Sequence, residues 1–99
     1  MKLELAPRAL RDAERHAHWW RENRPAARLL FDDELAVGLA QIRANPDIGL
    51  AYSGIAGKDY RRILLPRTRF HVYYRLAAPG RIRVLAIWGA ARARGPRLR

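Results

Sequence analysis

The sequence predicts an α+β fold in which a helical hairpin packs against an antiparallel sheet. A chain of 99 residues with 49 % hydrophobic residues can bury one modest core. Apolar residues recur at helical spacing in the first half, and alternating, strand-like segments follow in the second. We therefore expect one domain over residues 1–99, with an N-terminal strand, the hairpin, a three-stranded antiparallel meander packed on it, and an irregular basic C-terminal tail.

The first half predicts a short strand and two helices. Lys2–Leu5 alternates charged and apolar residues, and Pro7 suits the first turn of a helix. Asn23-Arg24-Pro25 ends this helix, Pro25 can start the next, and Asn45-Pro46 stops the second. The expected apolar faces are Leu10, Ala13, Ala17 and Trp20 in the first helix, and Ala27, Phe31, Leu35, Gly38, Leu39 and Ile42 in the second.

The second half predicts a loop followed by three strands. Residues 45–59 contain Pro46 and three glycines, which favour a loop. Because the gaps between the following segments are short, neighbouring strands should be antiparallel. The expected strands are Tyr60–Leu65, Phe70–Leu76 and Ile82–Trp88.

The net positive charge lies entirely in residues 58–99. Residues 1–57 contain eight basic and eight acidic residues, whereas residues 58–99 contain twelve basic residues and one acid, Asp59. The second part therefore carries the whole formal net charge of +11. Such asymmetry indicates an anionic partner. The alternative is a solvated basic face that keeps the protein soluble.

Strand alternation predicts where the arginines lie. Directly paired residues point to the same face of a sheet, so Arg75 should lie opposite Arg81 or Arg83. The same parity places Arg61 on that face, although a single β-bulge would break the inference. The face turns apolar at Leu85 and Ile87, which suit a protein partner or a covering C-terminal tail. The complete expected face is Arg61, Arg75, Arg81, Arg83, His71, Tyr73, Leu85 and Ile87.

Several chemistries are disfavoured. The chain has no cysteine, which excludes disulfides and thiolate metal sites. His16 and His18 diverge on a helix, so we expect no metal and no cofactor. Ser53 lacks the context of a catalytic serine, and Gly54, Gly57 and Lys58 lack the spacing of a phosphate-binding loop. With no signal-peptide core and no membrane-length apolar run, a cytoplasmic protein is expected.

Trp19 and His71 each allow both a structural and a functional interpretation. Trp19 lies roughly 140° from the apolar stripe of its helix, so it either packs on the second helix or anchors a partner. His71 is either a surface residue or a general base, because its ordinary pKa suits proton transfer near neutral pH.

An ordered set of short motifs resembles the RelE/ParE toxin superfamily of type II toxin–antitoxin systems. The set spans essentially the whole chain. It comprises Pro7-Arg8-Ala9, Asn45-Pro46 with Gly49, Tyr60-Arg61-Arg62, Phe70-His71-Val72-Tyr73-Tyr74-Arg75, and Val84-Leu85-Ala86-Ile87-Trp88 with Arg92.

The resemblance implies an intracellular toxin held inactive by a co-expressed antitoxin, and it implies one of two activities. ParE-type toxins inhibit DNA gyrase, whereas RelE-type toxins cleave messenger RNA on the ribosome using sheet arginines and a Tyr or His near the C-terminus. Residues 89–99 contain neither Tyr nor His, and arginine is a poor proton shuttle. This departure favours the ParE-type activity.

The expected site residues follow from this interpretation. A gyrase inhibitor would have no catalytic residues and would bind its target through Arg61, Arg75, Arg81, Arg83, Arg92 and Arg94. An acidic antitoxin segment would cover the basic face, with anchors near Trp19, Leu85 and Ile87. The ribosome-dependent ribonuclease alternative would use His71, Tyr73, Arg75 and Arg83. A third alternative is a plain nucleic-acid-binding module, whose affinity would fall steeply with salt.

Overall fold

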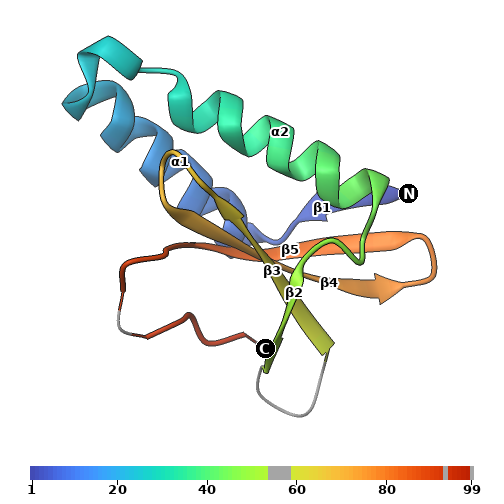
Figure 1. Cartoon of the computed structure of the whole chain (residues 1–99). Helices are drawn as coiled ribbons and strands as arrows, with labels where there is room; N and C mark the ends of the chain where they lie inside the picture. Colours follow the sequence, from blue (N-terminus) through green and yellow to red (C-terminus); the bar gives the residue numbers. More distant parts are fainter. Residues whose placement is uncertain (54–58, 93, 99) are drawn as a thin grey trace.

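Figure 1 shows the computed structural model of the chain, which describes residues 1–53, 59–92 and 94–98. A strand, two helices and four further strands confirm the predicted α+β class. The elements are β1 (Lys2–Leu5), α1 (Pro7–Asn23), the 3₁₀ turn η1 (Pro25–Ala27), α2 (Leu30–Ala44), β2 (Leu50–Ser53), β3 (Asp59–Leu65), β4 (Phe70–Ala78) and β5 (Arg81–Gly89).

The strands form one sheet in the order β1-β5-β4-β3-β2. β1 pairs with β5 in parallel, and the other neighbours are antiparallel. Both helices cover one face, whereas the C-terminal tail (residues 90–92 and 94–98) runs beneath the opposite face (Figure 1). The two faces are called the helix side and the tail side below. No helix among the described residues is long and apolar enough to span a membrane.

The second helix begins later than Pro25, where the sequence placed its start. Pro25–Ala27 forms a separate 3₁₀ turn, in which the Ala27 amide donates to the Arg24 carbonyl, and α2 begins at Leu30. Ala27 therefore does not belong to the apolar face of α2. The separate turn lets the chain reverse direction between the two helices (Figure 1).

The helix side buries the larger core. Figure 1 shows α1 and α2 lying over the sheet, and their buried residues pack against alternate strand residues. Leu10 was expected in this core but is 51 % exposed, because the buried positions of α1 start from Ala9 instead. The buried members of the core are Ala9, Ala17, Phe31, Leu35, Ile42, Leu65, Val72, Tyr74, Ile82, Val84 and Ile87.

The predicted loop over residues 45–59 contains a strand. Leu50–Ser53 forms β2 and pairs antiparallel with the start of β3, so that Tyr52 lies beside Tyr60. A four-residue edge strand has too little alternation to be recognised in sequence, and its pairing with β3 defines it. Gly54, Gly57 and Lys58, which were discounted as a phosphate-binding loop, lie outside the described residues.

A shift in register between β4 and β5 changes which side chains share a face. Tyr73 lies opposite Ala86 but Tyr74 lies opposite Val84, which leaves Leu85 as an extra residue on β5. After such a bulge, the alternation of inward and outward side chains restarts. Ile87 therefore points to the helix-side core, while Leu85 points to the tail side.

Glu34 joins α2 to the turn between β3 and β4. Its carboxylate accepts hydrogen bonds from the backbone amides of Arg67 at 2.8 Å and Thr68 at 2.9 Å, and from the Thr68 hydroxyl at 2.6 Å. Partial burial alone would raise the pKa of Glu34. The hydrogen bonds from Thr68 and Arg67, together with the Arg67 charge, hold this pKa below its ordinary value.

Replacing Glu34 with glutamine is expected to make the stability of the protein less sensitive to acid. Because the folded-state pKa is lowered, the carboxylate stabilises the fold above its ordinary pKa near 4.5. That contribution is lost as pH falls through the lower folded-state pKa. Thermal unfolding from about pH 7 down to about pH 3 should show a steeper loss of Tm in the wild type than in Glu34→Gln. Exposed Asp33→Asn is the matched control, and parallel curves for all three proteins would refute the assignment.

Candidate functional site

Three strand arginines gather on the tail side at one end of the sheet. Arg75 lies directly opposite Arg83, which confirms the expected cross-strand pair, and Arg81 is exposed at the start of β5. Arg83 lies 3.4 Å from the Glu4 carboxylate on β1. The side chains of Arg75 and Arg81 have no hydrogen-bond or ion-pair partner among the described residues. Arg75, Arg81 and Arg83 are called the arginine cluster below.

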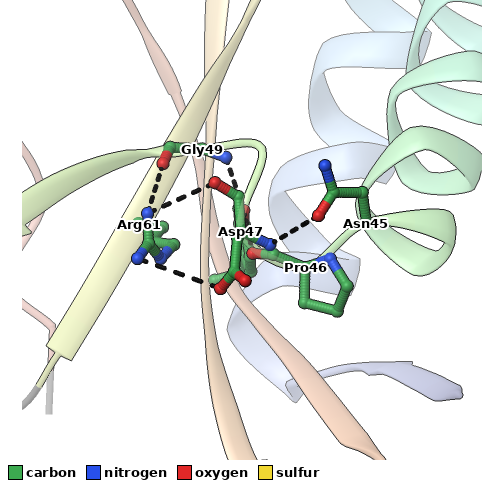
Figure 2. A network of polar contacts seen from close by, with 6 residues as sticks. Asn45, Pro46, Asp47, Gly49 and Arg61 are labelled. Carbon is green, nitrogen blue, oxygen red and sulfur yellow. Dashed lines mark hydrogen bonds and ion pairs between the residues drawn. The ribbon is translucent and has the colours of Figure 1, made fainter.

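Arg61 does not join this cluster, contrary to the sequence prediction. It pairs with Tyr74 and lies on the helix side of the sheet edge, because of the register of β3 and β4. Figure 2 shows its guanidinium holding the turn after α2, with Nη1 donating to the carbonyls of Gly49 at 2.8 Å and Asp47 at 3.3 Å. The Asp47 carboxylate lies 3.9 Å from Nη2. Arg61 therefore stabilises the turn that follows α2.

Arg62 occupies the tail-side position that the sequence assigned to Arg61. Its guanidinium carbon lies 5.4 Å from the centre of the Tyr52 ring, and Nη1 lies 3.4 Å from the Tyr73 hydroxyl. The Tyr52 and Tyr73 rings meet edge to face at 4.8 Å. Adjacent Arg61 and Arg62 must point to opposite faces, so a one-residue slip in register exchanges them.

The C-terminal tail closes much of the tail side. The Trp88 indole Nε1 donates to the Arg94 carbonyl at 2.7 Å, and Arg8 Nη1 donates to the Arg97 carbonyl at 2.6 Å. Leu98, which is 2 % exposed, packs in a second cluster of buried residues. Its other members are Tyr60, Tyr73, Leu85 and Ala86.

Leu85 and Ile87 are therefore not the exposed apolar anchors that strand parity predicted. Leu85 is 8 % exposed and shares a buried cluster with Leu98, as the alternative of a covering tail had anticipated. Ile87 is completely buried in the helix-side core because of the bulge at Leu85. Neither side chain projects from the surface as an exposed anchor in this conformation.

Gly95 provides a test of how the tail docks. A Cβ atom at Gly95 would run into the Tyr52 hydroxyl, whereas one at Gly89 would meet only Arg92 Cγ at an ordinary 3.8 Å. We expect Gly95→Ala to displace the tail and speed trypsin cleavage after Arg94 and Arg97. Gly89→Ala should be cleaved at the wild-type rate, and equal cleavage of both variants would contradict tail docking through Gly95.

The two side chains considered for proton transfer have different environments. Tyr73 is 1 % exposed beneath the tail. His71 is half-buried, and its ring centre lies 6.0 Å from that of Tyr73. Partial burial, followed by the charges of Arg62 and Arg69, lowers the pKa of His71. His71 is therefore neutral at pH 7, and Tyr73 is shielded from solvent.

A separate aromatic cavity lies beside the C-terminal half of α1. Trp19 is 46 % exposed, which confirms that it leaves the apolar stripe, while Trp20 packs against the helix-side core. The Arg24 guanidinium lies 5.0 Å from the Trp19 ring and 5.9 Å from the Trp20 ring. The cavity has a volume of about 380 Å³ and is lined by His16, Trp19, Trp20, Arg24, Thr68 and Phe70.

His16 is a structural part of this cavity. Its Nε2 donates to the Ile87 carbonyl at 2.8 Å, and its ring lies 4.2 Å from that of Phe70. Burial lowers the pKa of His16, so the ring is neutral at pH 7. No group of three or more potential metal ligands occurs among residues 1–53, 59–92 and 94–98.

Comparison with known proteins gives two matches. A family model described as "ParE toxin of type II toxin-antitoxin system, parDE" matches residues 3–94. The fold is similar to one in the crystal structure of the intact E. coli RelBE toxin–antitoxin complex, with a TM-score of 0.59 and 19 % sequence identity. That similarity covers 92 % of this chain and 98 % of the other. None of the curated proteins compared matches significantly.

Proposed function

Because the chain belongs to the ParE toxin family of type II toxin–antitoxin systems, we propose that it inhibits DNA gyrase by binding and does not cleave RNA. The observation that carries this proposal is the closed tail side. Tyr73, one of the residues that a ribonuclease would use, is 1 % exposed and packs in the buried cluster that contains Leu98 of the chain's own tail. The tail itself supplies neither Tyr nor His. A surface of this kind suits binding better than proton transfer.

The proposed target-binding residues are those basic side chains that remain accessible. Arg81 is exposed, Arg75 and Arg83 are partly exposed, and Arg92 and Arg94 are exposed in the tail. The Arg92 guanidinium is held 4.4 Å from the centre of the Trp88 ring, which fixes its position. Arg61 is left out of the proposed set because its guanidinium is engaged by the Asp47–Gly49 turn.

The physiological partner of a toxin of this family is an antitoxin. We place one antitoxin anchor at the aromatic cavity, because Trp19 and Arg24 offer an exposed, partly apolar surface of the type enriched at binding hot spots. Leu85 and Ile87 are not proposed as anchors, since both are buried.

A gyrase assay tests the proposal. Purified toxin, freed of its antitoxin and refolded, should inhibit the supercoiling of relaxed plasmid by gyrase. The double variant Arg75→Gln, Arg81→Gln should inhibit at least tenfold less potently, because two solvent-accessible guanidiniums are lost. Arg28→Gln, an exposed arginine far from the cluster, is the matched control. Full supercoiling in the presence of folded wild-type toxin would overturn gyrase inhibition.

A ribosome-dependent ribonuclease is the second candidate, and the neutral state of His71 favours it. A neutral imidazole beside arginines can accept a proton while cations hold the phosphate. Translating ribosomes given the toxin would then yield messenger RNA cut in the decoding site. His71→Ala should abolish that cleavage, whereas His18→Ala, an exposed histidine on α1, should not. Intact messenger would remove this candidate.

A further inference from the structure

An arginine-lined cavity opens where β1 ends and α1 begins. β1 pairs with β5 only as far as Leu5 and Val84, because Pro7 starts α1. β5 continues beyond this point without β1, and Arg97 and Leu98 of the tail line the resulting notch. The notch has a volume of about 390 Å³ and is lined by Ala6, Arg8, Arg83, Leu85, Arg97 and Leu98. This cavity is called the arginine pocket.

The arginine pocket combines three positive side chains with an apolar floor. Arg8, Arg83 and Arg97 come from α1, β5 and the tail, so the folded chain brings together charges that are far apart in sequence. Ala6, Leu85 and Leu98 supply apolar surface, and the last two are 8 % and 2 % exposed. Like charges that converge in this way repel one another, and an anion in the pocket offsets that repulsion.

The contacts of the three guanidiniums leave capacity for an anion. Arg8 donates to the Arg97 carbonyl through Nη1 and lies 5.5 Å from the Trp88 ring centre. Arg83 faces the half-exposed Glu4 carboxylate at 3.4 Å, a partner that solvent weakens. The Arg97 side chain forms no hydrogen bond or ion pair within the part of the chain described. Arginine presents its N–H groups as a planar fork that matches a carboxylate.

We propose that the arginine pocket binds a peptide segment of the antitoxin that carries a carboxylate side chain next to an apolar one. The carboxylate would lie among the three guanidiniums, and the apolar side chain would cover Leu85 and Leu98. The apolar floor favours a peptide, whose aliphatic side chains can cover it, over the polar sugar–phosphate backbone of a nucleic-acid strand. Glu4 would compete with the incoming carboxylate for Arg83. The proposal rests on the antitoxin partner and is independent of gyrase as the target.

Binding of a labelled hexapeptide of alternating glutamate and leucine, followed by fluorescence anisotropy at low salt, tests this proposal. Arg97→Gln should weaken binding about tenfold, because a charge-assisted contact is lost while the Arg97 carbonyl still receives Arg8. Glu4→Gln should strengthen binding about threefold, because a competing carboxylate is removed. Arg28→Gln, which removes the same charge from the exposed turn between η1 and α2, should bind like the wild type.

Three probes separate the possible outcomes. A hexapeptide of alternating glutamine and leucine should bind at least tenfold more weakly, and equal binding would show that the pocket recognises apolar groups alone. Hexathymidylate that binds more tightly than the acidic peptide, with the same dependence on Arg97, would reassign the pocket to nucleic acid. Absence of binding at millimolar peptide, or equal affinities of Arg97→Gln and Arg28→Gln, would overturn the proposal. None of these measurements involves gyrase, so their failure leaves the proposed target untouched.

Discussion

Replacing Asp12 with alanine is expected to lower the free energy of unfolding by about 3 kcal/mol. Asp12 is 4 % exposed in the middle of α1, and its Oδ2 accepts a hydrogen bond from the buried Ile87 amide at 3.0 Å. Its Oδ1 accepts from Arg15 at 3.1 Å. Alanine would leave the Ile87 amide buried without a partner at the β5 edge that β1 does not reach. Thermal unfolding should show Tm reduced by about 10–20 °C.

The controls for Asp12 separate the hydrogen bond from the change of charge. Asp12→Asn retains an oxygen that can accept from Ile87, so it should recover most of the lost stability. Glu14→Ala removes an exposed carboxylate from the same helix and should change stability by less than about 0.5 kcal/mol. Equal Tm values for Asp12→Ala and Glu14→Ala would show that the contact with Ile87 contributes nothing.

The hydroxyl of Tyr74 is expected to stabilise the fold by about 2 kcal/mol through the turn after α2. It donates to the Pro46 carbonyl at 2.7 Å and accepts from the Gly49 amide at 2.9 Å. Burial raises the pKa of Tyr74, so the hydroxyl remains protonated and able to donate. Tyr74→Phe would leave two backbone groups unpaired. Urea unfolding of the variant should give a lower midpoint with an unchanged m value.

Tyr60 provides a matched control, because removal of its hydroxyl should not lower the free energy of unfolding. Its hydroxyl is buried and has no hydrogen-bond partner within the described residues. Tyr60→Phe should therefore leave the free energy of unfolding unchanged or raise it by up to about 1 kcal/mol. If Tyr60→Phe and Tyr74→Phe were equally destabilising, loss of the packing of the hydroxyl oxygen rather than loss of its hydrogen bonds would explain both.

The local sequence signals predicted the helices and the long strands because those signals are themselves local. Pro7 fixes the start of α1, Asn45-Pro46 ends α2, and the alternation of Phe70–Leu76 marks β4. Each is decided within a few residues, by backbone dihedrals and side-chain period. β2 was not predicted, because a four-residue edge strand is defined by its pairing with β3 and not by its own sequence pattern.

The proposed site was predicted less completely, because strand register depends on the whole sheet. One extra residue at Leu85 moved Ile87 into the helix-side core, and the register of β3 with β4 exchanged Arg61 for Arg62 on the tail side. The predicted pairing of Arg75 with Arg83 is confirmed, because both residues lie on the far side of that bulge. There the predicted alternation of side chains between the two faces still applies.

The sequence by itself determined the class of fold, the family and the concentration of positive charge after residue 57. These properties depend on composition, local periodicity and the order of motifs along the chain. The tertiary structure decided which arginines are accessible and that Arg61 stabilises a turn. It also decided that the tail covers Tyr60 and Tyr73. Those outcomes depend on a bulge and on contacts such as that between Arg8 and Arg97, which lie 89 positions apart. No local pattern encodes such contacts, because they join residues that lie far apart along the chain.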